Sequence, residues 1–270
     1  MKLNQFSKQV IERAEGLRII DDALWRLIAE QKGVCQEILR IFLHDDALIV
    51  QSVTAQDTIK SLHREITLDA KCILGDGTIC NIEMQKGNAN DDIRRVRFHA
   101  SSLTASYTPK GIEFKDVPAV KILYITEYDA LKNGRAVTHM TRCIEGDNGY
   151  QPIDDGEDII FANTEIKDDS QESKLLQLFL RTDAFHEKMY PNLSEAVNYF
   201  KQSEGGKCEM CKSIESYAQE YAREYAQGRE KEIIKNLLVR NEDSIEEIAS
   251  ICNTSVDFVK EVQEELLTFA

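Results

Sequence analysis

The sequence is poor in proline and lacks long apolar runs. It has four prolines and thirteen glycines in 270 residues, and 42% of the residues are hydrophobic. Such a chain can bury one substantial core and still carry an additional segment. No stretch reaches the roughly eighteen apolar residues of a membrane-spanning helix, and residues 1–10 lack the charged-then-apolar pattern of a signal peptide. We therefore predict a soluble, cytoplasmic protein with one globular domain and a helical tail.

Disulfide bonds are not indicated either. The seven cysteines are an odd number. Several of them, such as Cys35, Cys72, Cys80 and Cys143, stand among apolar residues, where a reduced thiol packs as a small hydrophobic group. We therefore predict core thiols.

Positive charge is scarce in the chain as a whole. The net charge is −14, which argues against a protein that coats nucleic acid, because affinity for the phosphate backbone comes mainly from Lys and Arg. Residues 61–115 differ from the rest, with eight Lys/Arg and seven Asp/Glu. The acidity therefore lies outside this segment.

The spacing of apolar residues predicts the order of the main elements. Residues 24–28 and 38–42 have helical spacing, and Gly33 separates them. Five β-type runs and one helix, at about 92–106, follow. The runs are 66–74, 79–85, 117–128, 137–144 and 158–163. This order predicts a mixed sheet covered by helices in one α/β or α+β domain, over residues 6–202.

A helical module is predicted for residues 208–270. Apolar residues at spacings of three and four form one stripe, which predicts a long amphipathic helix over 208–242. Ser244 and Glu247 then have the spacing of a capping box, and Asn253 breaks the run that follows. The result is a helix-turn-helix outline.

Charge indicates that this outline does not read DNA. Residues 244–270 hold one lysine and six acids, which is unfavourable for entering a phosphate-lined groove. We predict a protein-contact role for the module, such as homo-oligomerisation. Residues 204–207, with two adjacent glycines, are the best candidate for the linker before it.

One β-hairpin can be predicted in detail because its loop contains two glycines. Residues 75–77 fit a three-residue hairpin loop in which Gly77 takes the left-handed position. Counting back along both strands from this loop places Asp69 directly opposite Glu83. Opposed residues have Cβ atoms about 4.5–5.5 Å apart, so the two carboxylates are close enough to hold one hard cation.

The same register sorts the side chains of the hairpin by polarity, because alternate residues of a strand face opposite sides. The polar face holds Thr67, Asp69, Lys71, Asn81, Glu83 and Gln85. The apolar face holds Leu68, Ala70, Cys72, Cys80, Ile82 and Met84. A shift by one residue would destroy this separation. The polar face is open to two interpretations, a metal site or a solvated strand surface with cross-strand polar pairs.

Several stretches resemble one known family. They are Leu68-Asp69-Ala70, the run Asn-Ile-Glu-Met-Gln at 81–85, the run Arg-Arg-Val-Arg-Phe-His at 94–99, and parts of the tail at 209–225 and 244–249. Together they resemble the recombination-promoting nuclease and transposase family, a branch of the PD-(D/E)XK nuclease superfamily, over most of the chain. The resemblance implies a restriction-endonuclease-like mixed sheet flanked by helices and metal-dependent hydrolysis of DNA. No residue indicates strand joining, so we predict hydrolysis only.

The resemblance also implies roles for individual residues. The family pattern is an acid on one strand and Glu-x-Lys or Glu-x-Gln on the next, which Asp69, Glu83 and Gln85 match. Asp69 and Glu83 would then bind Mg²⁺, or Mn²⁺ in its place, with the Met84 carbonyl completing the protein ligands. Gln85 would orient a water, but it lacks the charge of the usual lysine. Lys71, diagonal to Glu83 on the polar face, is our candidate for that charge.

Superfamily members often add an acid from the first core helix, and Glu37 is our candidate for a further metal ligand. Asp21 and Asp22 are interpreted instead as helix-start residues, favourable at the positive end of the helix dipole. His99 is expected to be a core or partner histidine, since a metal-activated water needs no general base.

Three arginines follow the second strand of the hairpin. Arg94, Arg95 and Arg97 lie on the predicted helix, and guanidinium groups suit phosphate because of their fork of donors. We predict that they hold the substrate. Asp91 and Asp92 leave a second interpretation open, in which the arginines only form ion pairs on the helix surface.

A different class of function also remains open. The chain could be a catalytically silent relative that acts as a binding or assembly protein through its acidic helical tail. The overall charge and the missing lysine favour this alternative. Metal binding at Asp69 and Glu83 separates the two classes, because only a nuclease requires it. RNA in place of DNA is a further alternative.

Overall fold

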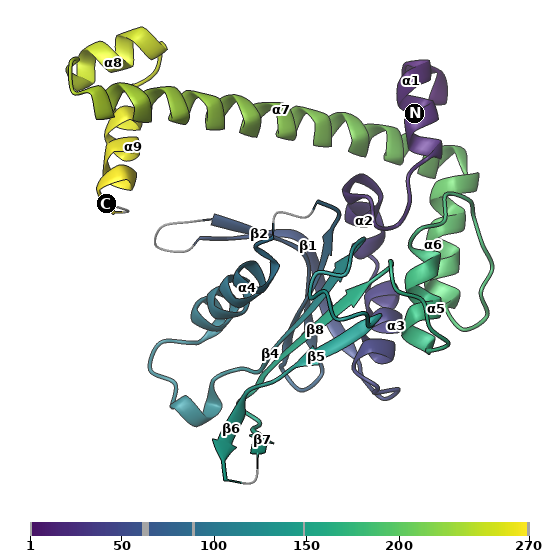
Figure 1. Ribbon diagram of the computed structural model, residues 1–270. Helices are drawn as coiled ribbons and strands as arrows, with labels where there is room; N and C mark the ends of the chain where they lie inside the picture. The colour runs from purple at the N-terminus through teal and green to yellow at the C-terminus, as the bar shows by residue number, and fades with distance from the viewer. Residues whose placement is uncertain (1, 61–64, 88–89, 148, 269–270) are drawn as a thin grey trace. The chain divides into compact units, whose positions relative to one another are not determined.

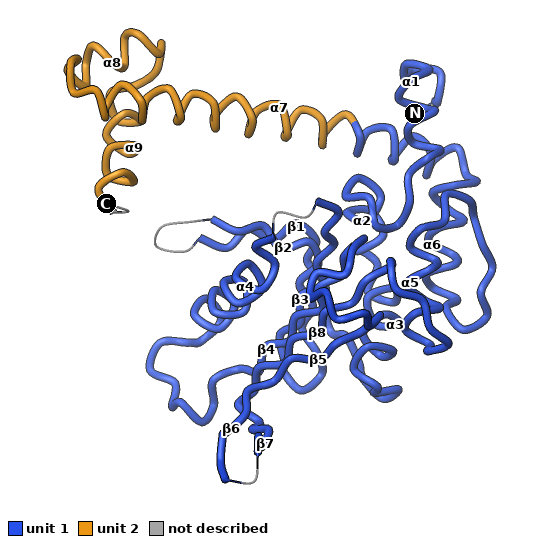
Figure 2. Tube along the Cα trace, in the orientation of Figure 1, with its two compact units in different colours: residues 1–214 blue, residues 215–270 orange. Residues whose placement is uncertain are grey.

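The computed structural model describes residues 2–60, 65–87, 90–147 and 149–268. The chain forms two compact units, residues 1–214 and 215–270, and each is considered by itself (Figure 2). The predicted domains, 6–202 and 208–270, place the boundary slightly earlier in the chain.

Helices form the start of the first unit. They are η1 (Leu3–Gln5), α1 (Lys8–Glu15), α2 (Asp22–Ala29) and α3 (Lys32–Phe42). The predicted break at Gly33 is wrong, because Gly33 lies within α3. It is instead a point of close approach, where a Cβ atom would lie 2.5 Å from Asn192 Oδ1.

A six-stranded mixed sheet forms the centre of the first unit (Figure 1). In spatial order the strands are β1 (Val50–Lys60), β2 (Glu65–Leu74), β3 (Ile79–Gln85), β4 (Val120–Thr126), β8 (Glu157–Asn163) and β5 (Val137–Met140). Strands β3, β4 and β8 are parallel, and the other neighbours are antiparallel. The predicted run 137–144 divides into β5 and β6 (Cys143–Gly146), which pairs with β7 (Gly149–Pro152) in a separate hairpin.

Strand β1 falls where no strand is predicted. Its sequence mixes polar and small residues without a clean apolar alternation, and few of its residues are buried. Both features follow from its position, because β1 is the edge strand of the sheet and pairs only with β2.

Helices cover both faces of the sheet (Figure 1). The remaining elements of the unit are α4 (Asp92–Tyr107), η2 (Phe114–Asp116), α5 (Gln171–Leu178) and α6 (Pro191–Gln202). Helix α4 packs on one face, with Leu103 and Tyr124 in its core. Helices α2, α3, α5 and α6 share the other core, which contains Trp25 and Phe42. The predicted mixed sheet flanked by helices is therefore confirmed.

The predicted linker at 204–207 is wrong. Helix α7 (Glu204–Arg240) begins directly after Ser203, the extended C-cap residue of α6. Gly206 allows α7 to leave α6 at such close range, since a Cβ there would collide with the main chain at Tyr199. The two glycines thus serve a tight helix junction.

The second unit contains the rest of α7 with α8 (Ile245–Cys252) and α9 (Val256–Thr268). Ser244 and Glu247 form the predicted capping box, and Asn253 ends α8 in the left-handed conformation with φ 53°. Helix α9 follows α8 after this turn. Its small core consists of Ile234, Ile248, Ala249, Val259 and Val262.

The apolar stripe predicted along α7 is interrupted. Met210 and Ile214 are buried in the first unit, and Ile234 is buried in the second. Between them Tyr221 and Tyr225 are 62% and 63% exposed. The middle of α7 therefore presents tyrosines to solvent within its own unit.

Two predictions about the whole chain can be compared with the structure. No helix among the described residues is long and apolar enough to cross a membrane. The seven cysteines are free thiols, but Cys143 is exposed in β6 and is not a core residue.

Candidate metal and nuclease site

The β2–β3 hairpin has the predicted loop and register. Gly77 takes the left-handed conformation with φ +88°. Ala70 and Ile82 form the last pair of the ladder on the side away from the loop, and Asp69 and Glu83 come next. The two acids therefore lie where the paired part of the hairpin ends.

Asp69 ends the ladder with its side chain. Its Oδ2 accepts a hydrogen bond from the Met84 N–H at 2.9 Å, and its Oδ1 accepts one from Gln56 Nε2 at 3.4 Å. The carboxylate thus takes the place that a main-chain carbonyl of β2 would hold in a continued ladder. This bond fixes Asp69 between the two strands.

The β1–β2 pair also twists at this point, so that side chains before and after it pack on opposite faces of the sheet. Gln56, which stands opposite Asp69 in the register, has a positive φ of 53°. Ala70 packs in the core beneath α2 and α3, whereas Leu68 packs in the core beneath α4. The prediction that Leu68 and Ala70 share a face is therefore wrong, because the ribbon turns between them.

Glu83 is held from the side of the sheet that α4 covers. Its Oε1 accepts a hydrogen bond from Asn81 Nδ2 at 2.5 Å and lies 3.3 Å from His99 Nδ1. Glu83 and His99 are each 7% exposed and Asn81 is fully buried. The expected role of His99 as a partner histidine agrees with this contact.

The two acids act on each other electrostatically. Burial and the charge of Glu83 raise the pKa of Asp69 well above its usual value, although the Met84 N–H opposes the shift. The charge of Asp22 raises this pKa further. Two carboxylates that repel each other in a shielded place favour either a shared proton or a cation.

Asp22, the first residue of α2, is a further acid whose charge acts on Asp69, and the sequence alone does not indicate this. It was interpreted as a helix-start residue, and helix starts are common places for acids. Its neighbour Asp21 is hydrogen-bonded to Arg18 and to Lys86, whose Nζ lies 2.5 Å from Asp21 Oδ1. Lys86 follows directly after β3, so this contact fixes the start of α2 beside the end of β3.

Glu37, the predicted further metal ligand, is engaged at another helix in this structure. Its Oε1 accepts hydrogen bonds from the Asn192 main chain and side chain at 2.8 and 2.5 Å, and its Oε2 accepts the Leu193 N–H at 3.0 Å. Asn192 and Leu193 belong to the first turn of α6. Glu37 therefore caps α6 from α3, where its charge suits the positive end of the helix dipole.

Lys71 does not contact Glu83 or Gln85. Its Nζ donates to Asp57 Oδ2 at 2.5 Å and to the Tyr107 hydroxyl, which ties β2 to β1 and α4. Although burial acts against its charge, these partners raise the pKa of Lys71 above its usual value. The contacts give no support to Lys71 as a substitute for the missing catalytic lysine.

Gln85, the last residue of β3, is partly buried. Its Nε2 donates to the Gly87 carbonyl at 2.7 Å, and Tyr128 donates its hydroxyl to the same carbonyl at 3.1 Å. The amide is therefore oriented by the turn that follows β3. Its oxygen remains an acceptor for a water.

The arginine cluster divides into two kinds. Arg95 is half-buried, with one guanidinium nitrogen 3.3 Å from Asp91, and the charge of Glu83 also acts on it. Arg94 and Arg97 are exposed and form no ion pair within the described part of the chain. Of the three arginines, Arg95 is the one that fits the interpretation as an ion pair on the helix surface.

Oxygen atoms are the donors that this site offers to a metal. Within the described ranges no group of three or more His, Cys, Asp or Glu side chains is close enough to hold an ion. The expected ligand set thus has two side chains, Asp69 and Glu83, together with the Met84 carbonyl, which points to the same side of β3 as the N–H that Asp69 accepts. This set suits Mg²⁺, which is commonly bound through one or two carboxylates and keeps several waters.

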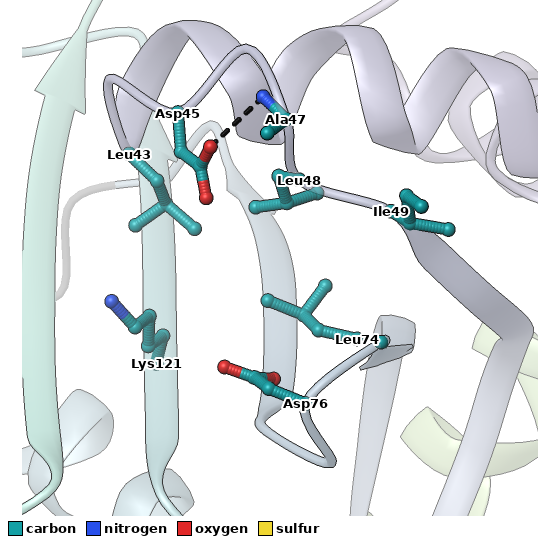
Figure 3. Close-up of a pocket in the computed structure, with 9 residues that line it drawn as sticks. Leu43, Asp45, Ala47, Leu48, Ile49, Leu74, Asp76 and Lys121 are labelled. Atoms are coloured by element: carbon teal, nitrogen blue, oxygen red, sulfur yellow. Dashed lines mark hydrogen bonds between the residues drawn. The ribbon is translucent and has the colours of Figure 1, made fainter.

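A separate pocket lies beside the hairpin loop (Figure 3). It is lined by apolar side chains from the segment between α3 and β1 and by Leu74 of β2, together with Asp45, Asp76 and Lys121. Five residues separate Asp69 from the loop along β2, which places Asp69 about 20 Å from Gly75 at the rise of a strand. The pocket is thus distinct from the carboxylate pair.

The mixed sheet between helix layers, with paired acids at the end of a hairpin, is the architecture expected of a PD-(D/E)XK core. A family model described as PD-(D/E)XK nuclease family transposase matches residues 29–202. This range spans more than half of the chain, including the whole sheet, and the chain belongs to that family. Comparison with curated proteins and with solved structures gives no match.

Proposed function

We propose that this protein is a metal-dependent nuclease that hydrolyses DNA phosphodiester bonds at Asp69 and Glu83. The observation that carries the proposal is the pairing of two carboxylates at the end of the β2–β3 ladder, where burial and mutual charge raise the pKa of Asp69. Membership of a nuclease family supports the same chemistry. A pair of acids placed in this way is most stable with a cation between them.

Asp69, Glu83 and the Met84 carbonyl would hold Mg²⁺ or Mn²⁺. When bound there, the metal would lower the pKa of a water and offset the charge that grows on the phosphate. The protein's part is to keep the ligands in place. The Met84 N–H and Gln56 hold Asp69, and Asn81 holds Glu83. Asp22 adds negative charge near Asp69, which attracts a cation to the site.

Gln85 would position the attacking water through its amide oxygen. Because a glutamine carries no charge, it cannot stabilise a hydroxide or the phosphate transition state as a lysine does. We therefore expect a slower enzyme than a nuclease with Glu-x-Lys.

Arg94 and Arg97 are the residues proposed to hold DNA. They are three apart on α4, so they share a face, and both are exposed without an ion pair among the residues described. Arg95 is less suited to bind substrate because Asp91 already occupies it.

Cleavage of supercoiled plasmid tests the proposal. The purified protein should nick the plasmid with Mg²⁺ or Mn²⁺ and stop when EDTA removes the metal. Asp69→Ala and Glu83→Ala should each lose at least about a hundredfold in rate, which corresponds to roughly 3 kcal/mol of transition-state stabilisation. Glu65→Ala, an exposed acid of the same strand, should cleave normally. Nicking that persists in both site variants would refute the assignment.

A silent assembly protein is the second candidate function. The observations that favour it are the uncharged Gln85 and the exposed Tyr221 and Tyr225 of α7. If the folded wild type cleaves neither DNA nor RNA under any metal condition, this candidate takes precedence. Light scattering would then show whether the chain forms homo-oligomers that are lost when both tyrosines are replaced by Ser.

A further inference from the structure

A group of polar side chains lies between β3 and α4, behind the metal-facing side of Glu83. Asn81 and Glu83 are two apart on β3, and Arg95 and His99 are four apart on α4, so each pair shares one face of its element. Asn81, Glu83 and His99 are all at least nine-tenths buried. An apolar layer would be expected at such a depth between a sheet and a helix.

Two of these side chains converge on a single oxygen. Asn81 Nδ2 donates to Glu83 Oε1 at 2.5 Å, and His99 Nδ1 lies 3.3 Å from the same atom. The second contact is within ion-pair range but is not aligned as a hydrogen bond.

Several buried polar atoms here have no hydrogen-bond partner among the described residues. They are Asn81 Oδ1, His99 Nδ1 and Arg95 Nε. An unsatisfied buried polar atom is costly for folding. Such atoms gathered around a carboxylate are typical of a site where strain serves function.

We propose that Asn81 and His99 are positioning residues that hold Oε1 of Glu83, so that Oε2 remains free to bind the metal. The inference rests on the proposed function. A carboxylate that can rotate freely is not held in the orientation that the metal requires. Residues that hydrogen-bond to a metal ligand and fix its orientation typically strengthen metal affinity about 10- to 100-fold. For this role His99 must carry its hydrogen on Nδ1, and a small rotation of the ring would align it with Oε1.

The proposal also links α4 to the metal site. His99 lies one turn after Arg95 on the same helix, and it connects that helix to the metal ligand on β3. Helix α4, which carries the arginines, and the metal ligand on β3 are therefore joined through His99. Substitutions at His99 should for this reason weaken metal binding while the protein remains folded.

Binding of Mn²⁺ to the full chain without DNA tests this role. The titration, followed by calorimetry or by the electron paramagnetic resonance of free Mn²⁺, compares wild type with Asn81→Ala, His99→Gln and His99→Asn. An asparagine amide can take the place of Nδ1, whereas a glutamine amide takes the place of Nε2. His99→Gln and Asn81→Ala should weaken Mn²⁺ binding about tenfold or more, and His99→Asn should restore most of the affinity. Thermal unfolding in EDTA shows that each variant is folded.

The Mn²⁺ titrations can overturn the positioning role of Asn81 and His99 in three ways. Wild-type affinity in Asn81→Ala and His99→Gln, together with loss of binding in Asp69→Ala and Glu83→Ala, would overturn the positioning role and leave the proposed nuclease intact. Equal losses in His99→Asn and His99→Gln would also overturn it, since ring packing and not the donor would then matter. If wild type binds no Mn²⁺, the proposed function fails and this inference fails with it.

Discussion

Asp69 combines two tasks in one side chain. Its Oδ2 accepts the Met84 N–H as a carbonyl of β2 would, which keeps the end of β3 in place. Burial and the charge of Glu83 raise the pKa of the same carboxylate. Without a cation, the hydrogen bond to the Met84 N–H stabilises the fold, whereas the repulsion between Asp69 and Glu83 destabilises it.

The two tasks can be separated with Asp69→Asn. The amide keeps an oxygen for the Met84 N–H but removes the charge that opposes Glu83. We expect the variant to be more stable than wild type in EDTA at neutral pH, by roughly 1 kcal/mol or about 2–4 °C in Tm. Differential scanning calorimetry measures the difference.

Added Mg²⁺ supplies the control. It should raise the Tm of wild type more than that of Asp69→Asn, because the variant has lost a ligand charge. A variant that melts below wild type in EDTA would show that the charge pair does not destabilise the metal-free protein.

At the residue scale, the sequence predicts which side chains of the hairpin lie opposite each other, because alternate residues of a strand face opposite sides. The glycine position in the loop sets the register, and the register places Asp69 and Glu83 together. The turn of the ribbon at Gln56 could not be foreseen, since a positive φ at a residue other than glycine has no sequence signal. Asp22 was hidden for another reason, because an acid at a helix start already has an adequate explanation.

At the scale of elements, Glu37 shows how one acid can serve a helix other than its own. It lies on α3 and accepts three hydrogen bonds from the start of α6. Glu37→Ala should therefore destabilise the protein by about 1–2 kcal/mol, the usual cost of a lost helix cap. Urea unfolding measures this effect, with Glu30→Ala as the control, because Glu30 is exposed at the end of α2.

Mn²⁺ affinity should not change in Glu37→Ala, because the carboxylate is fully engaged at α6. A large loss of Mn²⁺ binding without a loss of stability would restore Glu37 as a metal ligand.

Helices and strands whose apolar residues recur at regular spacing can be predicted from the sequence, and those without such spacing cannot. The hairpin strands, α4 and the capped α8 occur close to their predicted bounds. Strand β1 was missed because an edge strand needs few buried residues. Gly205 and Gly206 indicated a linker, but glycine also permits close contact between main chains, and contacts distant in sequence decide between the two.

At the scale of the whole molecule, charge is distributed unevenly between the two units. Residues 215–270 carry thirteen Asp/Glu and six Lys/Arg, which is half of the net charge of −14. Residues 61–115, which contain the acid pair and the arginines, have eight Lys/Arg against seven Asp/Glu. An acidic chain can therefore belong to a nuclease family, because phosphate contact depends on local charge.

The central claim is that Asp69 and Glu83 together bind one divalent metal. The most direct measurement is anomalous diffraction at the manganese edge from crystals grown with Mn²⁺. The account predicts a single strong peak about 2.2 Å from carboxylate oxygens of both Asp69 and Glu83. Well-ordered carboxylates at saturating Mn²⁺ with no peak between them, or with the metal at another group of residues, would contradict it.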